Sequence, residues 1–370
     1  MRNYFFLLLT LLIFMKSQAQ QHLNLIIGTY TNTCESKGIY VYDFDTKTGD
    51  FKLKGSTDKV INPSYVTISD DTKYLYSVNE NGKGSTVSAF KFDAESGSLN
   101  FMNKQDSEGA DPCYILNDTK YVIAANYSGG TISVFEKNAD GALTKAKQVI
   151  QHKGKSINTE RQESAHVHMV LFSPDKKYVL ANDLGTDRIY IYRYNPNPNP
   201  GKKILRIKDS IAVKAGSGPR HMTFSNDGKF AYLLQELDGR ITVFSYADGI
   251  LKFLSETKVV EENFKGTISA AAIKISPDQR FVYATNRADA NEISYYQRGK
   301  DGGLLFKGRK KTLGKGPRDF TIDPSGSFLL VAHQYTNDVV IFRINKNSGE
   351  LTDTGKRISL CSPVNLVFAP

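Results

Sequence analysis

The chain has 370 residues, and its 48 Lys and Arg against 38 Asp and Glu give a formal net charge of +10. No Lys/Arg run reaches the density of nucleic-acid-binding segments, and frequent tyrosines are typical of β-strands, so we exclude nucleic acid as a partner. A moderately basic surface attracts small anionic molecules instead.

The chain begins with a segment typical of an export signal. Arg2 precedes the apolar run 5–15, and Ser17 to Ala19 supply the small residues that a signal peptidase accepts. The apolar run is too short to span a bilayer. We therefore expect a signal peptide at 1–19, export to the periplasm or beyond, and a mature protein without membrane contact. An uncleaved anchor is the alternative.

The remainder, 20–370, repeats one unit that is marked by an aromatic residue after a polar turn. These aromatic residues follow one another at intervals of about 47 to 57 residues, at Tyr74, Tyr121, Tyr178, Phe230, Phe281 and Phe328. A repeat of this length, rich in alternating apolar residues, is typical of propeller blades. The sequence predicts one all-β domain, a seven-bladed β-propeller with four antiparallel strands per blade.

The order of the strands predicts how the ring closes. First, innermost strands are expected to start at 63, 112, 167, 219, 270, 317 and 363, and second strands near 25, 74, 121, 178, 230, 281 and 328. The chain thus opens on a second strand and closes on a first strand. One blade is therefore expected to combine both termini, which leaves no open sheet edge at the seam.

Two segments depart from the repeat. The run NPNPNPG at 195–201 cannot join a sheet and is interpreted as a surface connector. The segment 154–165 is inserted just before His166, where a fourth strand leads to a first strand. We expect it to emerge at the same end of the ring as the first-strand starts and to cover part of that face.

The three cysteines, Cys34, Cys113 and Cys361, lie far apart and form no CxxC pair. Neither a structural zinc site nor a dense disulfide framework is indicated. One disulfide with one remaining thiol fits an oxidising compartment, but we favour three buried free thiols.

Polar residues gather where first strands start and second strands end, and these ends meet on one face of a propeller, which we call the mouth. First-strand starts supply His166, His168, Arg220, His221, Lys274, Arg318 and Asp319. Second-strand ends supply Asn79, Glu80, Asn126, Asn182, Asp183, Glu236, Asn286, Arg287, His333 and Gln334. Convergent titratable groups in a concave mouth indicate a functional site. The alternative is that such residues cap turns and line a water-filled channel.

Several motifs resemble one family. They are GPRHMTF at 218–224, AYLLQEL at 231–237, His168 ahead of the SPD at 173–175, AAIKISPD at 271–278 with TNR at 285–287, and GPRDF at 316–320. Together they resemble the lactonase family of seven-bladed propellers, which includes bacterial 6-phosphogluconolactonases and fungal carboxymuconate cyclases. The resemblance covers essentially the whole mature chain and implies a catalytic site of His168, Arg220, Glu236 and Arg287. One departure is Lys274, where relatives often have His.

Lactone opening needs an activated water, groups that stabilise the oxyanion, and an acid that protonates the leaving alkoxide. Glu236 is the first choice of general base, with His168 as the alternative base or the acid. Arg220 and Arg287 offer planar forks for an anionic group and for the oxyanion.

The following residues are further candidates for substrate binding: Arg318, Lys274, His166, His333 and Asp183. Asp183 is more readily explained as a partner of turn amides. His166 and His168 have the spacing of a metal pair but no accompanying carboxylate set, so we expect no metal and no cofactor.

Three functions stay open. We favour hydrolysis of a small anionic sugar lactone, as in 6-phosphogluconolactonase. The alternatives are a carboxymuconate-type lactone cyclase or isomerase, and a non-catalytic propeller that binds partners. Because the phosphorylated lactone of the pentose pathway is cytosolic, an exported enzyme favours another lactone. A closed ring needs no partner, so we expect a monomer.

Overall fold

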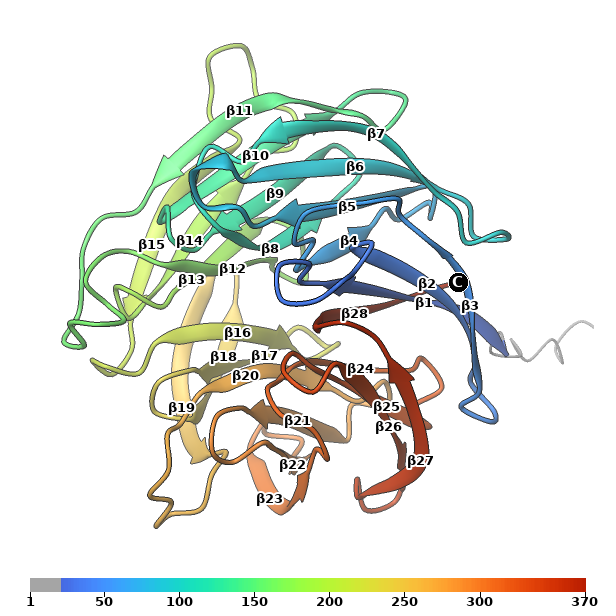
Figure 1. Ribbon diagram of the computed structural model, residues 1–370. Coiled ribbons are helices and arrows are strands. Elements are labelled where there is room, and N and C mark those ends of the chain that lie inside the picture. The colour runs from blue at the N-terminus through green and yellow to red at the C-terminus, as the bar shows by residue number, and fades with distance from the viewer. Residues whose placement is uncertain (1–20) are drawn as a thin grey trace, which may run out of the picture.

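The computed structural model describes residues 21–370, which form seven four-stranded antiparallel sheets arranged in a ring (Figure 1). The predicted seven-bladed β-propeller is confirmed. The predicted signal peptide at 1–19 lies outside the described residues. Within 21–370, no helix is long and apolar enough to cross a membrane.

The strands are numbered in chain order, and the blades follow the ring. Blade 1 holds β28 (Pro363–Ala369), β1 (His22–Thr29), β2 (Ile39–Asp45) and β3 (Phe51–Ser56). Blade 2 holds β4 (Val66–Ile68), β5 (Tyr74–Asn79), β6 (Thr86–Phe92) and β7 (Leu99–Asp106), with the short 3-10 turn η2 (Gly82–Gly84). Blade 3 holds β8 (Pro112–Asn117), β9 (Tyr121–Asn126), β10 (Thr131–Lys137) and β11 (Leu143–Gln151). Blade 4 holds β12 (Val167–Phe172), β13 (Tyr178–Asp183), β14 (Arg188–Tyr194) and β15 (Leu205–Ala212).

The remaining blades repeat this plan. Blade 5 holds β16 (Pro219–Phe224), β17 (Phe230–Gln235), β18 (Arg240–Ala247) and β19 (Ile250–Lys258). Blade 6 holds β20 (Ala270–Ile275), β21 (Phe281–Asn286), β22 (Glu292–Arg298) and β23 (Leu304–Lys311). Blade 7 holds β24 (Pro317–Ile322), β25 (Phe328–His333), β26 (Asp338–Ile344) and β27 (Leu351–Ser359). The first strands of neighbouring blades contact one another all around the ring, so they lie nearest its axis.

Two strand starts differ from the prediction. β1 begins at His22 rather than near Leu25, and β4 begins at Val66 rather than at residue 63. The delay in β4 has a local cause at Asn62, which has a positive φ of 41°. The Asn62 side chain accepts a hydrogen bond from the backbone of Thr31 and donates one to the carbonyl of Glu80, which holds this segment out of the ladder.

The aromatic residue that marks each repeat packs against the next blade. The ring of Tyr74 in blade 2 lies against Gly141 of blade 3, and Phe230 of blade 5 contacts Gly302 of blade 6 in the same way. Both glycines have a positive φ, and a Cβ on either would collide with the ring. The sequence period therefore corresponds to a repeated contact between blades.

Both termini build blade 1, as predicted, because β1 pairs antiparallel with β28. A disulfide between Cys34 and Cys361 lies beside this seam, with the two Cα atoms 5.9 Å apart. The expectation of three free thiols is therefore wrong, and Cys113 alone is a free, buried thiol. Ring closure brings together two cysteines that are 327 residues apart in sequence, so their spacing gave no signal.

Candidate active site

A cavity of about 310 Å³ lies at the mouth, and we call it the central cavity. Its lining comes from all seven blades: Tyr30, Glu80, Asp111, Cys113, Tyr127, Ser128, Arg161, His168, Glu236, Arg287 and Arg318. A concave site of this size, with several convergent titratable groups, is suited to a small polar ligand.

One structural rule places five of these eleven side chains. The residue that directly follows the second strand of a blade leaves the sheet at the mouth. The residues that obey this rule and line the central cavity are Tyr30, Glu80, Tyr127, Glu236 and Arg287. In five of the seven blades the repeat therefore presents this side chain to a common centre.

A second rule concerns the first strands, which carry a β-bulge near their start. The pairing of β12 with β13 passes from Val167 to Met169 and skips His168. In the same way β16 skips Arg220, β24 skips Arg318 and β8 skips Cys113. Because a bulged residue is released from the alternation of the strand, its side chain can be aimed at the mouth.

Glu236 is held by three arginines from different parts of the ring. Its Oε1 accepts a hydrogen bond from Nη2 of Arg161 at 2.7 Å, and its Oε2 accepts one from Nε of Arg220 at 2.8 Å. Nη2 of Arg287 lies 3.2 Å from the same Oε2. Burial alone raises the pKa of this carboxyl, but the three guanidinium groups outweigh burial and lower the pKa to about 2. Glu236 is therefore ionised at neutral pH.

His168 lies beside this cluster, with its Nε2 4.0 Å from Oε2 of Glu236. Burial, together with the positive charges of Arg220 and Arg318, holds the pKa of the imidazole well below its usual value. His168 is therefore neutral near pH 7, able to donate or accept a hydrogen bond but reluctant to take up a proton. The thiol of Cys113 lies 3.7 Å from its Nδ1, and burial raises the pKa of that thiol.

The other side of the central cavity holds a second carboxylate, Glu80. It accepts hydrogen bonds from the hydroxyl of Tyr30 at 3.1 and 3.2 Å and from the hydroxyl of Ser64. Nη2 of Arg318 lies 4.0 Å from its Oε1. Burial raises the pKa of Glu80, and the nearby positive charge of Arg318 lowers it by a smaller amount.

The structure brings together five of the residues that the sequence indicated. His168, Glu236, Arg287 and Arg318 line the central cavity, and the buried Arg220 contacts Glu236 directly.

The structure places the other four candidates elsewhere. Lys274 is the fifth residue of β20, beyond the strand start, and its Nζ pairs with Asp319 at 3.1 Å. His166 stacks on Tyr127 and supports that wall from behind. His333 is fully buried, with its ring packed against Gly314.

Asp183 has the structural role that the sequence favoured for it. One of its oxygens accepts hydrogen bonds from the backbone amides of His166, Gly185 and Thr186, and the other lies 2.8 Å from Nδ1 of His152. Its side chain is fully buried and does not line the central cavity.

Sequence reasoning missed six lining residues as site residues, which are Tyr30, Asp111, Cys113, Tyr127, Ser128 and Arg161. Arg161 belongs to the inserted segment 154–165, which was expected at the mouth, and the structure confirms that this segment reaches the central cavity. Tyr30 follows its second strand as Glu236 does, so the repeat itself held the signal. Glu80 was placed at the mouth without a role.

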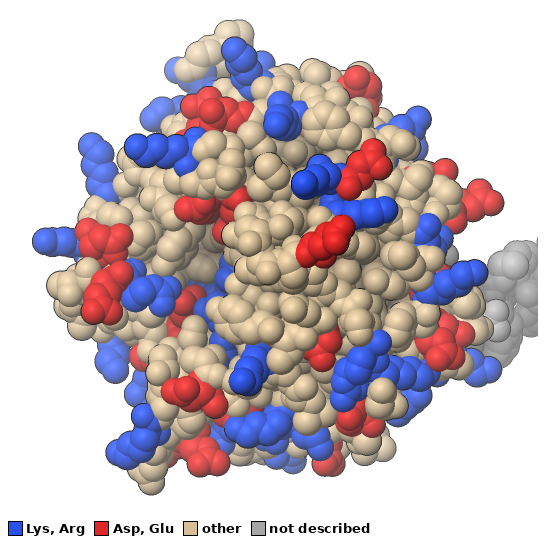
Figure 2. Space-filling view, in the orientation of Figure 1, with Lys and Arg blue, Asp and Glu red and all other residues tan. Residues whose placement is uncertain are grey.

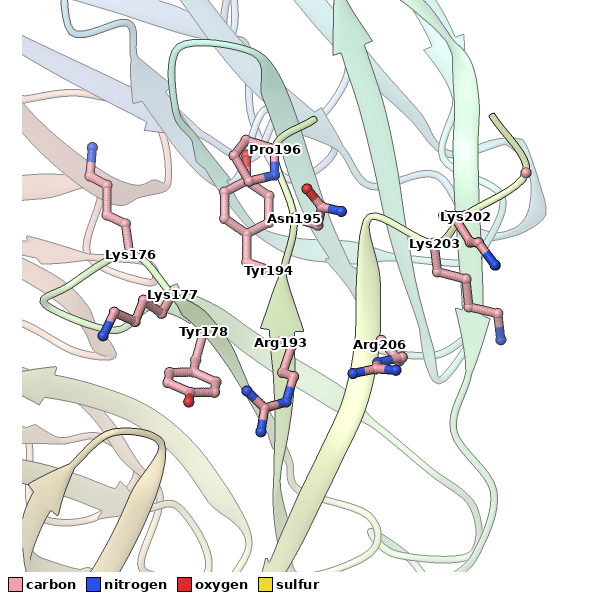
Figure 3. A pocket seen from close by; sticks show the side chains of 11 residues that line it. Lys176, Lys177, Tyr178, Arg193, Tyr194, Asn195, Pro196, Lys202, Lys203 and Arg206 are labelled. Carbon is pink, nitrogen blue, oxygen red and sulfur yellow. The ribbon is translucent and has the colours of Figure 1, made fainter. Parts of the chain in front are cut away.

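A larger depression of about 770 Å³ lies at the outer part of blade 4, beside the 195–201 loop (Figure 3). Arg193 and Arg206 are cross-strand neighbours there, and Lys176, Lys177, Lys202 and Lys203 surround them. All of these cations are exposed, whereas Glu236, His168 and Arg287 of the central cavity are buried. Elsewhere basic and acidic side chains are interspersed over the visible face (Figure 2). Across residues 21–370, no cluster of three or more His, Cys, Asp or Glu is placed to hold a metal ion.

Comparison with known proteins shows the family and agrees with the fold. The family model described as "Lactonase, 7-bladed beta-propeller" matches residues 24–368. A 6-phosphogluconolactonase of Formosa agariphila is 37% identical over 336 residues, which cover 88% of this chain and 94% of that protein. A 6-phosphogluconolactonase of Bacillus subtilis is 32% identical, with 92% and 97% covered.

Two solved structures are also closely similar. A putative 6-phosphogluconolactonase from Bacteroides fragilis superposes with a TM-score of 0.91 at 42% identity, covering 96% of this chain and 99% of that chain. A periplasmic gluconolactonase from Pseudomonas aeruginosa gives a TM-score of 0.88 at 34% identity, covering 94% and 99%.

Proposed function

Because the chain belongs to the lactonase family of seven-bladed β-propellers and is a lactonase, we propose that it opens an anionic sugar lactone in the central cavity. The observation that carries this proposal is the convergence of Arg161 from the inserted segment, Arg287 from blade 6 and Arg318 from blade 7 on one small cavity. Planar guanidinium groups bind carboxylate and phosphate groups with paired hydrogen bonds, which suits them to an anionic substrate.

In this mechanism the arginines have two tasks. They bind the anionic group of the substrate, and they stabilise the negative charge that develops on the carbonyl oxygen as water adds to the lactone. Glu236 keeps the side chains of Arg161, Arg220 and Arg287 in place. A carboxyl with a pKa of about 2 is too weak a base to activate water at neutral pH. Its proposed role therefore changes from base to positioning residue.

His168 is the third component. Since burial and the arginine charges keep its imidazole neutral, it acts as a hydrogen-bond donor to the carbonyl oxygen of the bound lactone. An imidazolium at this position would add a further charge to a site that already holds several guanidinium groups.

We further propose that the protein is exported and acts as a monomer. The likeness to a periplasmic gluconolactonase supports this choice, as does the N-terminal sequence. Cell fractionation and light scattering test the location and the oligomeric state.

Acid release from purified protein tests the activity. In a pH-stat we expect turnover of glucono-1,5-lactone 6-phosphate, which carries the anionic group, well above spontaneous hydrolysis, and weaker turnover of the neutral glucono-1,5-lactone. Turnover of a carboxylated muconate lactone, seen as a change in diene absorbance, would favour the cyclase alternative. No turnover of any lactone would favour a binding propeller.

A further inference from the structure

We propose that Glu80 is the general base that activates the hydrolytic water, and that Tyr30 is its positioning residue. This inference rests on the proposed lactone hydrolysis and adds the proton-transfer group that the arginine cluster does not supply. The central cavity contains two glutamates, Glu80 and Glu236, that occupy equivalent positions after β5 and β17. The two carboxylates differ in their hydrogen-bond partners and in their affinity for protons.

The backbone and side chain of Glu80 are both held in place. Its N–H donates to the carbonyl of Asn62 at 3.2 Å, and its own carbonyl accepts from Nδ2 of Asn62 at 2.9 Å. The carboxylate accepts hydrogen bonds from Tyr30 and Ser64, which come from blade 1 and from the segment before β4. A base that is fixed in this way loses little entropy when it meets a bound substrate.

The electrostatic environment of Glu80 suits a base. Three guanidinium groups approach Glu236 within 3.2 Å, whereas Arg318 stays 4.0 Å from Glu80. Burial raises the pKa of Glu80, and the arginine cluster lowers that of Glu236. When the surroundings shift the pKa values of two carboxyls of one site in opposite directions, the carboxyl with the higher pKa is the one that exchanges protons near neutral pH.

The other titratable groups of the central cavity fit the role less well. His168 resists protonation because of burial and the arginine charges, and burial keeps the Cys113 thiol protonated. Glu80 combines hydrogen-bonded placement with an affinity for protons.

The step balances as follows. Glu80 removes one proton from water while the water oxygen forms a bond to the lactone carbonyl carbon. The ring C–O bond then breaks, and the protonated Glu80 gives its proton to the departing ring oxygen, which becomes a hydroxyl. The product is a hydroxy acid, whose carboxyl proton passes to solvent, and Glu80 is again a carboxylate.

The alternative is that Glu80 merely ties blades 1, 2 and 7 together. Glu80→Gln separates the two roles, because the amide oxygen still accepts hydrogen bonds from Tyr30 and Ser64 but cannot take up a proton. With glucono-1,5-lactone and its 6-phosphate we expect kcat to fall by about 10²- to 10⁴-fold with KM little changed. The acid limb of the wild-type profile of kcat/KM against pH should disappear. Glu350→Gln, at an exposed turn, is the matched control and should behave as wild type.

Tyr30→Phe tests the same idea without removing the carboxylate. The Tyr30 hydrogen bond lowers the pKa of Glu80, so its loss should move the acid limb to higher pH. A purely structural Glu80 would leave the limb in place. This variant also serves if Glu80→Gln fails to fold, which circular dichroism would reveal.

The outcomes distinguish the two proposals. If wild-type protein hydrolyses lactones and Glu80→Gln keeps both its kcat and its acid limb, Glu80 is not the base although the proposed function stands. An unmoved acid limb in Tyr30→Phe would overturn the assignment equally. Wild-type protein that hydrolyses no lactone would overturn the proposed function itself.

Discussion

Nε of Arg220 donates a 2.8 Å hydrogen bond to Oε2 of Glu236, and both side chains are almost completely buried. The two residues come from the first strand of blade 5 and from the end of its second strand, so one bulge and one strand end create the pair. A buried ion pair of this kind is costly to break, because the remaining charge stays desolvated without its partner.

We predict that Arg220→Ala destabilises the protein by about 3–5 kcal/mol, because it leaves Glu236 with fewer partners in a buried position. Thermal or denaturant unfolding measures the loss. The matched variant is Arg161→Ala, whose side chain is 41% exposed and whose removal should cost far less stability. Equal stability of the two variants would contradict the structural importance of the Arg220 pair.

Arg161 should matter for substrate binding instead. Its guanidinium extends from the inserted segment into the central cavity and bonds Glu236 and the hydroxyl of Tyr127. We predict that Arg161→Ala raises KM for an anionic lactone by about 10- to 100-fold, the value of a charged hydrogen bond. The control is Arg206→Ala in the outer depression, which should leave KM unchanged. An equal increase of KM in both variants would contradict substrate binding in the central cavity.

Glu236 should make the stability of the folded protein depend on pH in the acidic range. Its pKa in the folded protein is lowered to about 2 from 4.5, so its ionised form favours folding above about pH 4.5. This contribution should disappear as the pH falls from about 4.5 towards 2. We predict that Glu236→Gln has a flatter dependence of the unfolding midpoint on pH over this window than wild-type protein. Parallel curves would show that Glu236 is not held as an anion.

The disulfide between Cys34 and Cys361 should stabilise the ring closure. It joins residues 327 apart in sequence and therefore restricts the unfolded chain strongly. We predict that the double variant Cys34→Ser, Cys361→Ser loses about 2–5 kcal/mol of stability. Added reductant should lower the melting temperature of wild-type protein and leave that of the double variant unchanged. If reductant also lowered the melting temperature of the double variant, the effect of reductant on wild-type protein could not be assigned to this disulfide.

The sequence predicted the ring because the repeat is a local signal. The aromatic residues such as Tyr74 and Phe230 recur since each must pack on the next blade, and the strand starts follow from that spacing. The order of first and second strands also predicted that blade 1 combines both termini.

The site was predicted less completely, because it depends on contacts between residues that are far apart in the sequence. Lys274 was assigned to a strand start, although β20 begins at Ala270 and carries this lysine away from the mouth. Cys34 and Cys361 meet through ring closure. The sequence favoured Glu236 as base because the arginines that lower its pKa come from blades 5 and 6 and from the inserted segment, so their approach to this carboxyl leaves no local signal.

Acid release from lactones by wild-type protein and Arg287→Ala tests the role of the central cavity most directly. Nη2 of Arg287 lies 3.2 Å from Glu236 and its side chain lines the central cavity, so it is placed to meet the substrate. We predict rapid hydrolysis by wild-type protein and a loss of about 10²-fold or more in kcat/KM for Arg287→Ala, with the fold retained. Equal rates for the two proteins would contradict catalysis at this cavity.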